Sequence, residues 1–330
     1  MRTGFEFRPC SGAPEDYAAV QAWVSLPGQQ TQPSSLEILS DRKGRGPSHK
    51  SEVFRLGGIP GLRGHVIAKR ADRKKLQLER FVYLELLRTL PVPSLHCFGY
   101  WEEPDDDIGW LFIEEAAGSA YDESDPVHRA VASRWVGQFH ASSASAQISR
   151  QLPRFDVSRY FAYLESARRD IADIASGRTS NEAHTVLERI RGECDAVEAH
   201  WHAIEAICQD FPQCAVHGDF IKKNVRVGER RGERTLLVMD WETAGWGSPV
   251  EDIAGLDVDS YLHEVRDVWS HLDAPSIRRA EVVGRVFRTL AWIAATTRWL
   301  GSESADWAIA DLAEYGQFLS GALVEVDIGS

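Results

Sequence analysis

The amino-acid sequence predicts an α+β protein, with an antiparallel sheet near the N-terminus and a mostly helical remainder. Residues 36–115 contain five short β-prone runs, separated by clusters of Gly, Pro, Asp or Ser that are typical of strand ends. One helix-period run lies among them, and the helix period dominates from residue 118 onward. A length of 330 residues suits two domains or one large one.

The elements expected in the N-terminal part follow from hydrophobic periodicity. A short amphipathic helix is expected first, at residues 14–26. A longer helix should run from Leu76 to Leu90, where Pro91 ends it, because proline cannot continue a helix. The expected strands are residues 36–39, 53–56, 65–69, 97–100 and 110–113. These elements predict one antiparallel sheet that carries a single helix.

The C-terminal part is expected to be helical around a small β-rich region. The expected helices are residues 126–142, 157–175, 181–208 and most of the chain after 250. The β-rich region consists of short strands at 215–216, 225–227 and 236–239. The connection between the two parts falls at 114–118, which predicts domains of residues 1–117 and 118–330.

Composition and charge exclude several classes of protein. A formal net charge of −12 argues against a nucleic-acid partner, because phosphate backbones bind basic surfaces. An acidic balance suits a cationic substrate, although many acidic proteins have none. The five cysteines form no CxxC pair, which is typical of reduced thiols. No signal peptide and no apolar run of membrane-spanning length are visible, so we expect a cytoplasmic protein with no membrane partner.

One segment carries a pattern that suits phosphoryl transfer. His217-Gly218-Asp219 is followed by Asn224, five residues after the aspartate, and a second acidic group, Asp240, follows the next two strands. One carboxylate can orient an attacking hydroxyl and accept its proton, while a carboxamide and a second carboxylate can hold Mg²⁺. An isolated His-Gly-Asp could equally be a turn. The complete spacing, ending in Asp-Trp-Glu, favours the phosphoryl-transfer interpretation.

These motifs resemble those of the aminoglycoside phosphotransferase and choline kinase group, small-molecule relatives of the protein kinases. The match to the group's HGDxxxxN and DxE-type motifs is complete at Asp219, Asn224 and Asp240. The resemblance implies a bilobal protein-kinase-like fold, with Asp219 as catalytic base and with Asn224 and Asp240 as catalytic Mg²⁺ ligands. It also implies that His217 supports the loop and that Asp252 serves loop architecture.

The N-terminal part resembles the nucleotide-binding lobe of the same group. Lys69 ends the run Val-Ile-Ala-Lys, as does the lysine that meets the α- and β-phosphates in kinases. Its ion-pair partner should lie on the following helix, where Glu79 and Glu85 are the acidic candidates. Spacing to the prolines after the helix resembles that in the antibiotic kinases and favours Glu79, leaving Glu85 on the surface.

The remaining nucleotide contacts are also implied by the resemblance. The backbones of Glu114 and Ala116 would hold the base at a hinge, with the glutamate side chains pointing to solvent. Ser48 and Ser51 lie in a Gly/Ser loop that would cover the phosphates, although this loop lacks the kinase GxGxxG pattern. No GxxxxGK[ST] is present, which argues against a P-loop enzyme.

The sequence therefore predicts a Mg²⁺-dependent O-phosphotransferase that uses ATP or GTP. Its acceptor would be a hydroxyl of a small molecule, such as an aminoglycoside-like antibiotic or another natural product. Two alternatives remain open: a kinase of Ser or Thr side chains on a peptide, and a kinase-shaped binding module without turnover. Lys222 and Lys223, inside the catalytic loop, could offset charge on the γ-phosphate or could both be solvated.

Overall fold

The computed structural model describes residues 5–29, 31–41, 51–104, 107–175, 180–230, 232–302 and 305–328. The chain forms two compact units, Met1–Glu123 with Phe220–Ala244, and Ser124–Asp219 with Gly245–Ser330. Dividing the sequence at residue 117 would place residues 220–244 with the second part. The contacts group them with the first, because a strand of this segment pairs with residues Ser119–Ala120.

The first unit is built on a six-stranded antiparallel sheet with strand order β1-β2-β3-β4-β6-β5. Its strands are β1 (Phe5–Pro9), β2 (Ser35–Asp41), β3 (Ser51–Gly57), β4 (Val66–Asp72), β5 (Cys97–Glu102) and β6 (Ile108–Glu114). The five strands predicted from the sequence are all present. The prediction missed β1, a five-residue run whose pairing with β2 is not visible in its own pattern.

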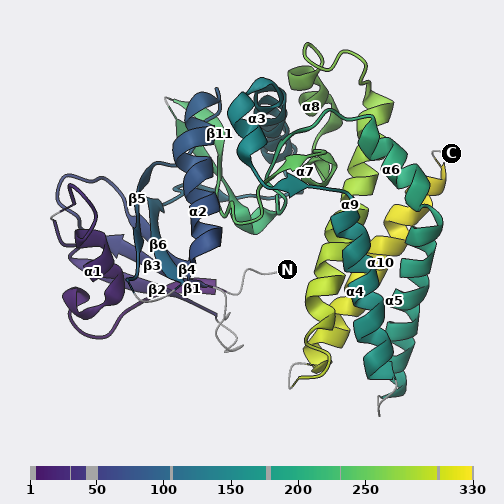
Figure 1. The fold of residues 1–330 in the computed structure, drawn as a ribbon, viewed down its shortest axis with the longest axis horizontal. Coiled ribbons are helices and arrows are strands. Elements are labelled where there is room, and N and C mark those ends of the chain that lie inside the picture. The colour runs from purple at the N-terminus through teal and green to yellow at the C-terminus, as the bar shows by residue number, and fades with distance from the viewer. Residues whose placement is uncertain are drawn as a thin grey trace. The chain divides into compact units, whose positions relative to one another are not determined.

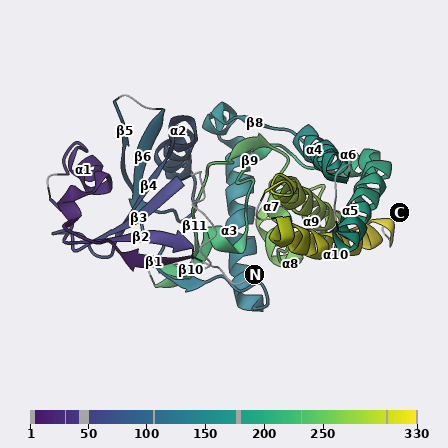
Figure 2. The same ribbon diagram turned by 90° about the horizontal axis from the view of Figure 1, so that it is seen from below.

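Two helices cover opposite faces of this sheet (Figures 1 and 2). The helix α2 (Arg73–Phe81) begins at Asp72, whose carboxylate accepts hydrogen bonds from the N–H groups of the next turn. It packs on β4, β5 and β6. A π-helical turn (Val82–Leu86) and a 3-10 turn (Leu87–Thr89) follow α2. These three elements together occupy the region predicted as a single helix ending at Leu90.

The other face of the sheet is covered by α1 (Ala18–Val24), which follows a 3-10 turn at Pro14–Asp16. Trp23 lies at the centre of this contact, fully buried, with its ring edge-on to Phe98 and Phe112. Its indole N–H donates to the carbonyl of Thr31, so the polar atom of the buried ring is satisfied. The N-terminal residues, to which the sequence assigned no role, therefore complete the core of the first unit.

A second, smaller sheet belongs to the same unit and has the order β11-β10-β7. It consists of β7 (Ser119–Ala120), β10 (Val225–Arg230) and β11 (Glu233–Val238), all antiparallel. Gly118, with φ of 158°, comes so close to the Val227 carbonyl that a side chain there would collide with it. The strand β10 therefore runs directly beside the end of β6 and the residues that follow it.

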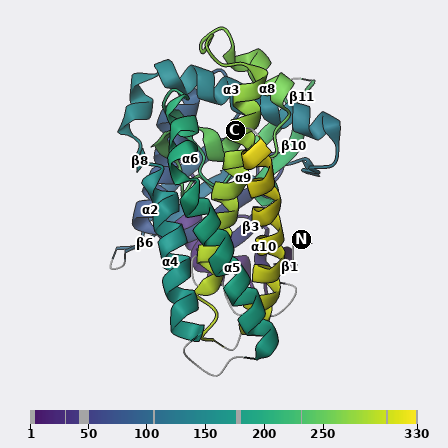
Figure 3. The same ribbon diagram turned by 90° about the vertical axis from the view of Figure 1, so that its right-hand side faces the viewer.

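The second unit is helical and centres on α9 (Ala274–Thr297), which packs against α4, α6, α7, α8 and α10. Figure 3 shows α4, α5, α9 and α10 side by side. The other helices are α3 (Pro126–Ser145), α4 (Ser158–Ala175), α5 (Asn181–Ala199), α6 (Trp201–Gln209), α7 (Val250–Ile253), α8 (Val258–Val265) and α10 (Ala305–Ile328). A small sheet of β8 (Arg154–Phe155), β12 (Gly245–Gly247) and β9 (Cys214–Val216) completes this unit.

The helix predicted at residues 181–208 is two helices. The first ends at Ala199, and His200 leaves helical geometry, with φ of −98° and ψ of 4°. The ring Nδ1 of His200 lies 2.8 Å from the Ala196 carbonyl. The side chain thus contacts one of the last carbonyl groups of the helix, which lack backbone N–H partners within it. Periodicity alone could not locate this break, because the apolar pattern continues through it.

Among the described helices, none combines the length and the apolar character that crossing a membrane would require.

The buried contact between α1 and the sheet makes a quantitative prediction. Trp23→Ala should lower the free energy of unfolding by roughly 3–5 kcal/mol, because it removes a large buried ring and leaves a cavity. Gln21→Ala, at an exposed position on the same helix, is the matched control and should change it by less than about 0.5 kcal/mol. Urea unfolding followed by far-UV circular dichroism measures both. Equal effects of the two changes would show that α1 does not stabilise the sheet.

Candidate active site

A buried ammonium group organises the candidate site in the first unit. Lys69 on β4 is 8% exposed, and its Nζ contacts a carboxylate oxygen of Glu79 on α2. The same atom lies 2.5 Å from Asp240 Oδ1 and 3.7 Å from Glu242 Oε2, both in the segment after β11. The consecutive elements β4 and α2 thus meet the distant segment after β11 at one charge.

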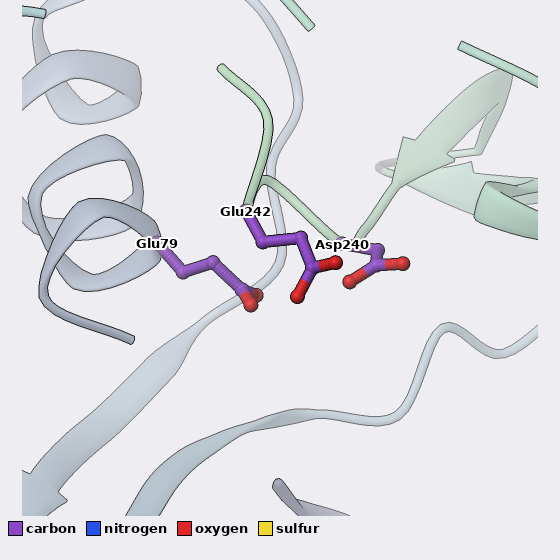
Figure 4. Close-up of side chains that lie close together, drawn as sticks. All are labelled: Glu79, Asp240 and Glu242. Atoms are coloured by element: carbon purple, nitrogen blue, oxygen red, sulfur yellow. The ribbon is translucent and has the colours of Figure 1, made fainter. Parts of the chain in front are cut away.

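The three carboxylates form a compact acidic cluster, in which one oxygen of each lies within 4.8 Å of the others (Figure 4). Lys75, in the first turn of α2, adds a second ammonium at 3.3 Å from Glu242 Oε1. Glu242 is the last residue of the Asp-Trp-Glu motif, but the motif alone predicted no role for it or for Lys75. The two-residue spacing between Asp240 and Glu242 is the signal that could have identified the second carboxylate.

The backbone at Asp240 is held in an unusual conformation. Its φ is 68°, which makes it the only residue other than glycine with a left-handed φ in the described part of the chain. Such conformations cost energy and persist where surrounding contacts impose them, often at functional positions. Here the ion pair with Lys69 fixes the side chain at the end of β11.

Burial and charge shift the pKa values of the ion pair. Burial raises the pKa of Glu79 to about 7, and the neighbouring Lys69 ammonium offsets part of that rise. Burial alone would lower the pKa of Lys69, but Glu79 and Asp240 outweigh it and raise the value. Lys69 is therefore cationic at neutral pH, and its charge favours the ionised form of Glu79 against the effect of burial.

The structure brings Glu79, and not Glu85, to Lys69. Glu79 is 1% exposed and faces the sheet from α2. Glu85 lies in the π-helical turn that follows and is exposed.

Asn224 ends a 3-10 turn directly before β10 and is 3% exposed. Its carbonyl accepts a hydrogen bond from the Met239 N–H at 2.9 Å, which ties the turn to the end of β11. In the same turn, Lys222 is half-buried and Lys223 is exposed.

The predicted hinge lies at the end of β6. The side chains of Glu114 and Glu115 were expected to point to solvent, but both have charged or polar partners. Arg230 donates to Glu114 at 2.6 Å, and His65 Nδ1 lies 2.8 Å from a carboxylate oxygen of Glu115. These partners are more than forty residues away in the sequence, so local pattern could not reveal them. The Ala116 N–H, in contrast, has no acceptor among the residues that the structure describes.

The predicted phosphate-covering loop falls mostly outside the described residues. Ser48 lies outside them, and Ser51 is the first residue of β3.

In the second unit, a buried carboxylate holds the backbone of the His-Gly-Asp segment. Asp252 accepts hydrogen bonds from the N–H of His217 at 2.6 Å and from the N–H of Gly218 at 3.0 Å. His140 Nε2 lies 3.3 Å from the same carboxylate, and His140 Nδ1 lies 2.9 Å from the Tyr261 hydroxyl. Burial alone would raise the pKa of Asp252, but the bonds from His140 and His217 hold it below its usual value.

Asp219 follows this fixed segment and is half-buried. Its N–H donates to His217 Nδ1 at 3.3 Å, so the histidine imidazole supports the loop from within. Asp219 is the last residue of this stretch of the second unit, whereas Asn224 and Asp240 belong to the first.

A second buried carboxyl group, which no sequence motif predicted, adjoins Asp252. Glu251 on α7 accepts a hydrogen bond from the hydroxyl of Tyr160, whose ring stacks on Phe287 at a centroid distance of 3.9 Å. Burial raises the pKa of Glu251 to about 8, and the bond from Tyr160 counteracts part of this rise. At neutral pH this side chain is largely a neutral acid.

The fold and the Lys69 cluster define a kinase-like protein, and comparison with known proteins agrees. Residues 61–300 match the sequence profile of the Phosphotransferase enzyme family. The chain therefore belongs to this family, and it is an enzyme that transfers phosphate to an alcohol group. No curated protein sequence is significantly similar to the chain.

Solved structures of similar fold include phosphotransferases that act on small molecules. They include an aminoglycoside 2'-phosphotransferase with GDP, with a TM-score of 0.61, 12% identity, and coverage of 92% of this chain and 98% of that one. A spectinomycin phosphotransferase with ADP and spectinomycin has a TM-score of 0.57 and 11% identity, covering 88% and 94%. A choline kinase from Cryptosporidium parvum has a TM-score of 0.57 and 11% identity, covering 96% and 95%. At these identities the likeness supports the kinase-like fold.

The Lys69 cluster predicts coupled losses of nucleotide binding. Lys69→Ala and Glu79→Ala should each raise the dissociation constant for ATP by roughly 10- to 100-fold, the range for a lost charge-assisted contact. The double variant should bind little worse than Lys69→Ala alone, because Glu79 would act by positioning Lys69. Glu85→Ala, exposed just beyond α2, is the control and should bind normally. Strictly additive losses would contradict the coupling.

The buried acid Glu251 predicts a pH-dependent stability. Its pKa is about 8 in the folded chain and near 4.3 when unfolded, so the folded state binds more protons between these values. The stability contribution of the protonated group is therefore present at low pH and is lost as pH rises toward 8. In Glu251→Gln, the decrease in the free energy of unfolding between low pH and pH 8 should be smaller than in the wild type by on the order of 1–4 kcal/mol.

Melting temperatures at about pH 5 and about pH 8 test this prediction. Glu165→Gln, at an exposed position on the same helix as Tyr160, is the control and should keep the wild-type dependence. Parallel pH profiles for the wild type and Glu251→Gln would show that Glu251 is ionised in the folded chain.

Proposed function

We propose that the chain transfers the γ-phosphate of ATP or GTP to a hydroxyl group of a small molecule, with Mg²⁺ as cofactor. The observation that carries the proposal is the Lys69 ammonium, held by Glu79 beside Asp240, in a chain of the Phosphotransferase enzyme family. An ammonium in this position suits the α- and β-phosphates of a nucleotide. Replacing the ion pair with apolar side chains could leave stability unchanged or improve it, so stability alone does not account for it.

The residues present fit a hard cation. Asp240, Glu242 and the Asn224 carboxamide offer oxygen ligands, which is the donor type that Mg²⁺ prefers. Bound Mg²⁺ would neutralise charge on the phosphates. Lys69, in turn, would orient the nucleotide.

In the transfer step, the acceptor hydroxyl oxygen forms a bond to the γ-phosphorus as the bond to the β–γ bridging oxygen breaks. Asp219 orients the hydroxyl and receives its proton, and the products are a nucleoside diphosphate and a phosphate ester. The bonds from His217 and Gly218 to Asp252 support this role, because they fix the backbone that precedes the base. The backbones of Glu114 and Ala116 would hold the nucleotide base, and Ser48 and Ser51 the phosphates.

The proteins of similar fold suggest where to look for the acceptor. One is bound to spectinomycin and another is a choline kinase, and both ADP and GDP occur among their nucleotides. A panel of aminoglycosides, spectinomycin, choline and other hydroxylated metabolites, each with ATP or GTP and Mg²⁺, tests the proposal directly. Phosphate transfer to Ser or Thr peptides alone would replace the small-molecule assignment. Failure to bind any nucleotide would contradict the function itself.

The proposed base makes a specific prediction. Asp219→Ala should reduce kcat on the order of 10²- to 10⁴-fold, the usual contribution of a positioned general base. Its dissociation constant for ADP should stay within about twofold of the wild type, because the Lys69 group is intact. Asp267→Ala, at a position whose side chain is 93% exposed, is the control. Retention of most of kcat in Asp219→Ala would remove this residue from the mechanism.

A further inference from the structure

Arg226 on β10 carries a charge for which the described residues provide no carboxylate partner. Its Nη1 donates to the carbonyls of Val225 at 2.8 Å and Lys223 at 3.3 Å. The side chain is half-buried, and no protein acceptor in the described part of the chain faces its Nε and Nη2 atoms. A partly desolvated guanidinium whose donors are only partly used is an uncommon feature in a stable protein.

The direction of this side chain follows from the two-residue period of the strand. Two positions further along β10, a Cβ added at Gly228 would lie 2.8 Å from the Ala117 carbonyl. Four positions further, Arg230 reaches Glu114 at 2.6 Å. Because positions 226, 228 and 230 share one face, Arg226 lies on the face of β10 that is turned toward the hinge.

Arg226 also lies between the two ends of the proposed nucleotide site. Asn224, a proposed metal ligand, is two residues before it, and Gly228, against the hinge backbone, is two residues after it. The interval from Arg226 to Gly228 corresponds to about 6.6 Å along the strand. A nucleotide with its base at the hinge and its phosphates at the metal would place its nucleoside part beside Arg226.

We propose that the guanidinium of Arg226 stacks on the face of the purine base of the bound nucleotide. The inference rests on the proposed function, and it adds a base-binding residue to it. A guanidinium is planar and weakly hydrated, so it packs well on aromatic rings. Burial lowers the pKa of Arg226, while Glu115 at the hinge opposes that effect. A ring that covers the guanidinium without removing its charge suits these surroundings.

Equilibrium binding of separate parts of the nucleotide tests the proposal without requiring the acceptor. Adenosine and guanosine present the base without phosphate, tripolyphosphate presents phosphate without a base, and ADP presents both. Arg226→Ala should raise the dissociation constants for adenosine or guanosine and for ADP by roughly 3- to 30-fold, the range of a partly desolvated cation–π contact. Tripolyphosphate should bind as it does to the wild type.

Arg234→Ala is the matched control, because Arg234 is exposed on β11 of the same hairpin and the variant loses the same charge. This variant should bind adenosine, guanosine, ADP and tripolyphosphate with the dissociation constants of the wild type. Arg226→Lys keeps the charge but not the planar group, so it should recover only part of the lost affinity, and it serves as the second variant if Arg226→Ala does not fold.

Two results would overturn the proposal. Unchanged nucleoside binding with weaker tripolyphosphate binding would make Arg226 a phosphate contact. Unchanged binding of every ligand would show that Arg226 has only a structural role, as a donor to the Lys223 carbonyl. A wild-type chain that binds none of the nucleotide ligands would instead contradict the proposed function, so the two failures are distinguishable.

Discussion

The structure of the first unit depends on satisfying one buried charge. An ammonium that is removed from water costs several kcal/mol unless it is paired, and Lys69 is 8% exposed. Glu79 brings α2 to β4, and Asp240 brings the end of β11 to the same point. The left-handed backbone of Asp240 is a local cost that this pairing offsets. The same contacts that hold the unit together therefore present charged groups where a polyphosphate and a metal would need them.

The second unit contains a buried anion, the Asp252 carboxylate, which also has to be stabilised. Asp252 has no lysine or arginine partner among the described residues, and it is held by backbone N–H groups and by His140. Those N–H groups belong to His217 and Gly218, and Gly218 has a left-handed φ of 72°. A carboxylate that accepts such bonds is stable in its charged form. The loop that carries Asp219 is thus positioned by a residue 33 places later in the chain.

Local pattern predicted most elements of the fold, because these depend on periodicity. The choice of Glu79 over Glu85 rested on a resemblance in spacing to the antibiotic kinases, and of the two side chains it is Glu79 that contacts Lys69. Features that depend on distant partners were not predictable. Arg230 and His65 restrain the hinge glutamates, β1 is defined only by its pairing with β2, and residues 220–244 join the first unit through β7.

The ion pairs of the hinge glutamates limit which groups could recognise a nucleotide base. Because the carboxylates of Glu114 and Glu115 are already paired, they are poor candidates for donors or acceptors to a base. In the proposed function the backbone at Ala116 would then supply the edge contacts, and each such hydrogen bond contributes only about 0.5–1.5 kcal/mol. Affinity for the ring itself has to come from groups above and below it. On the β10 side we propose that position for the guanidinium of Arg226, which has no ion-pair partner among the described residues, so base affinity in this chain would rest on stacking more than on hydrogen bonds.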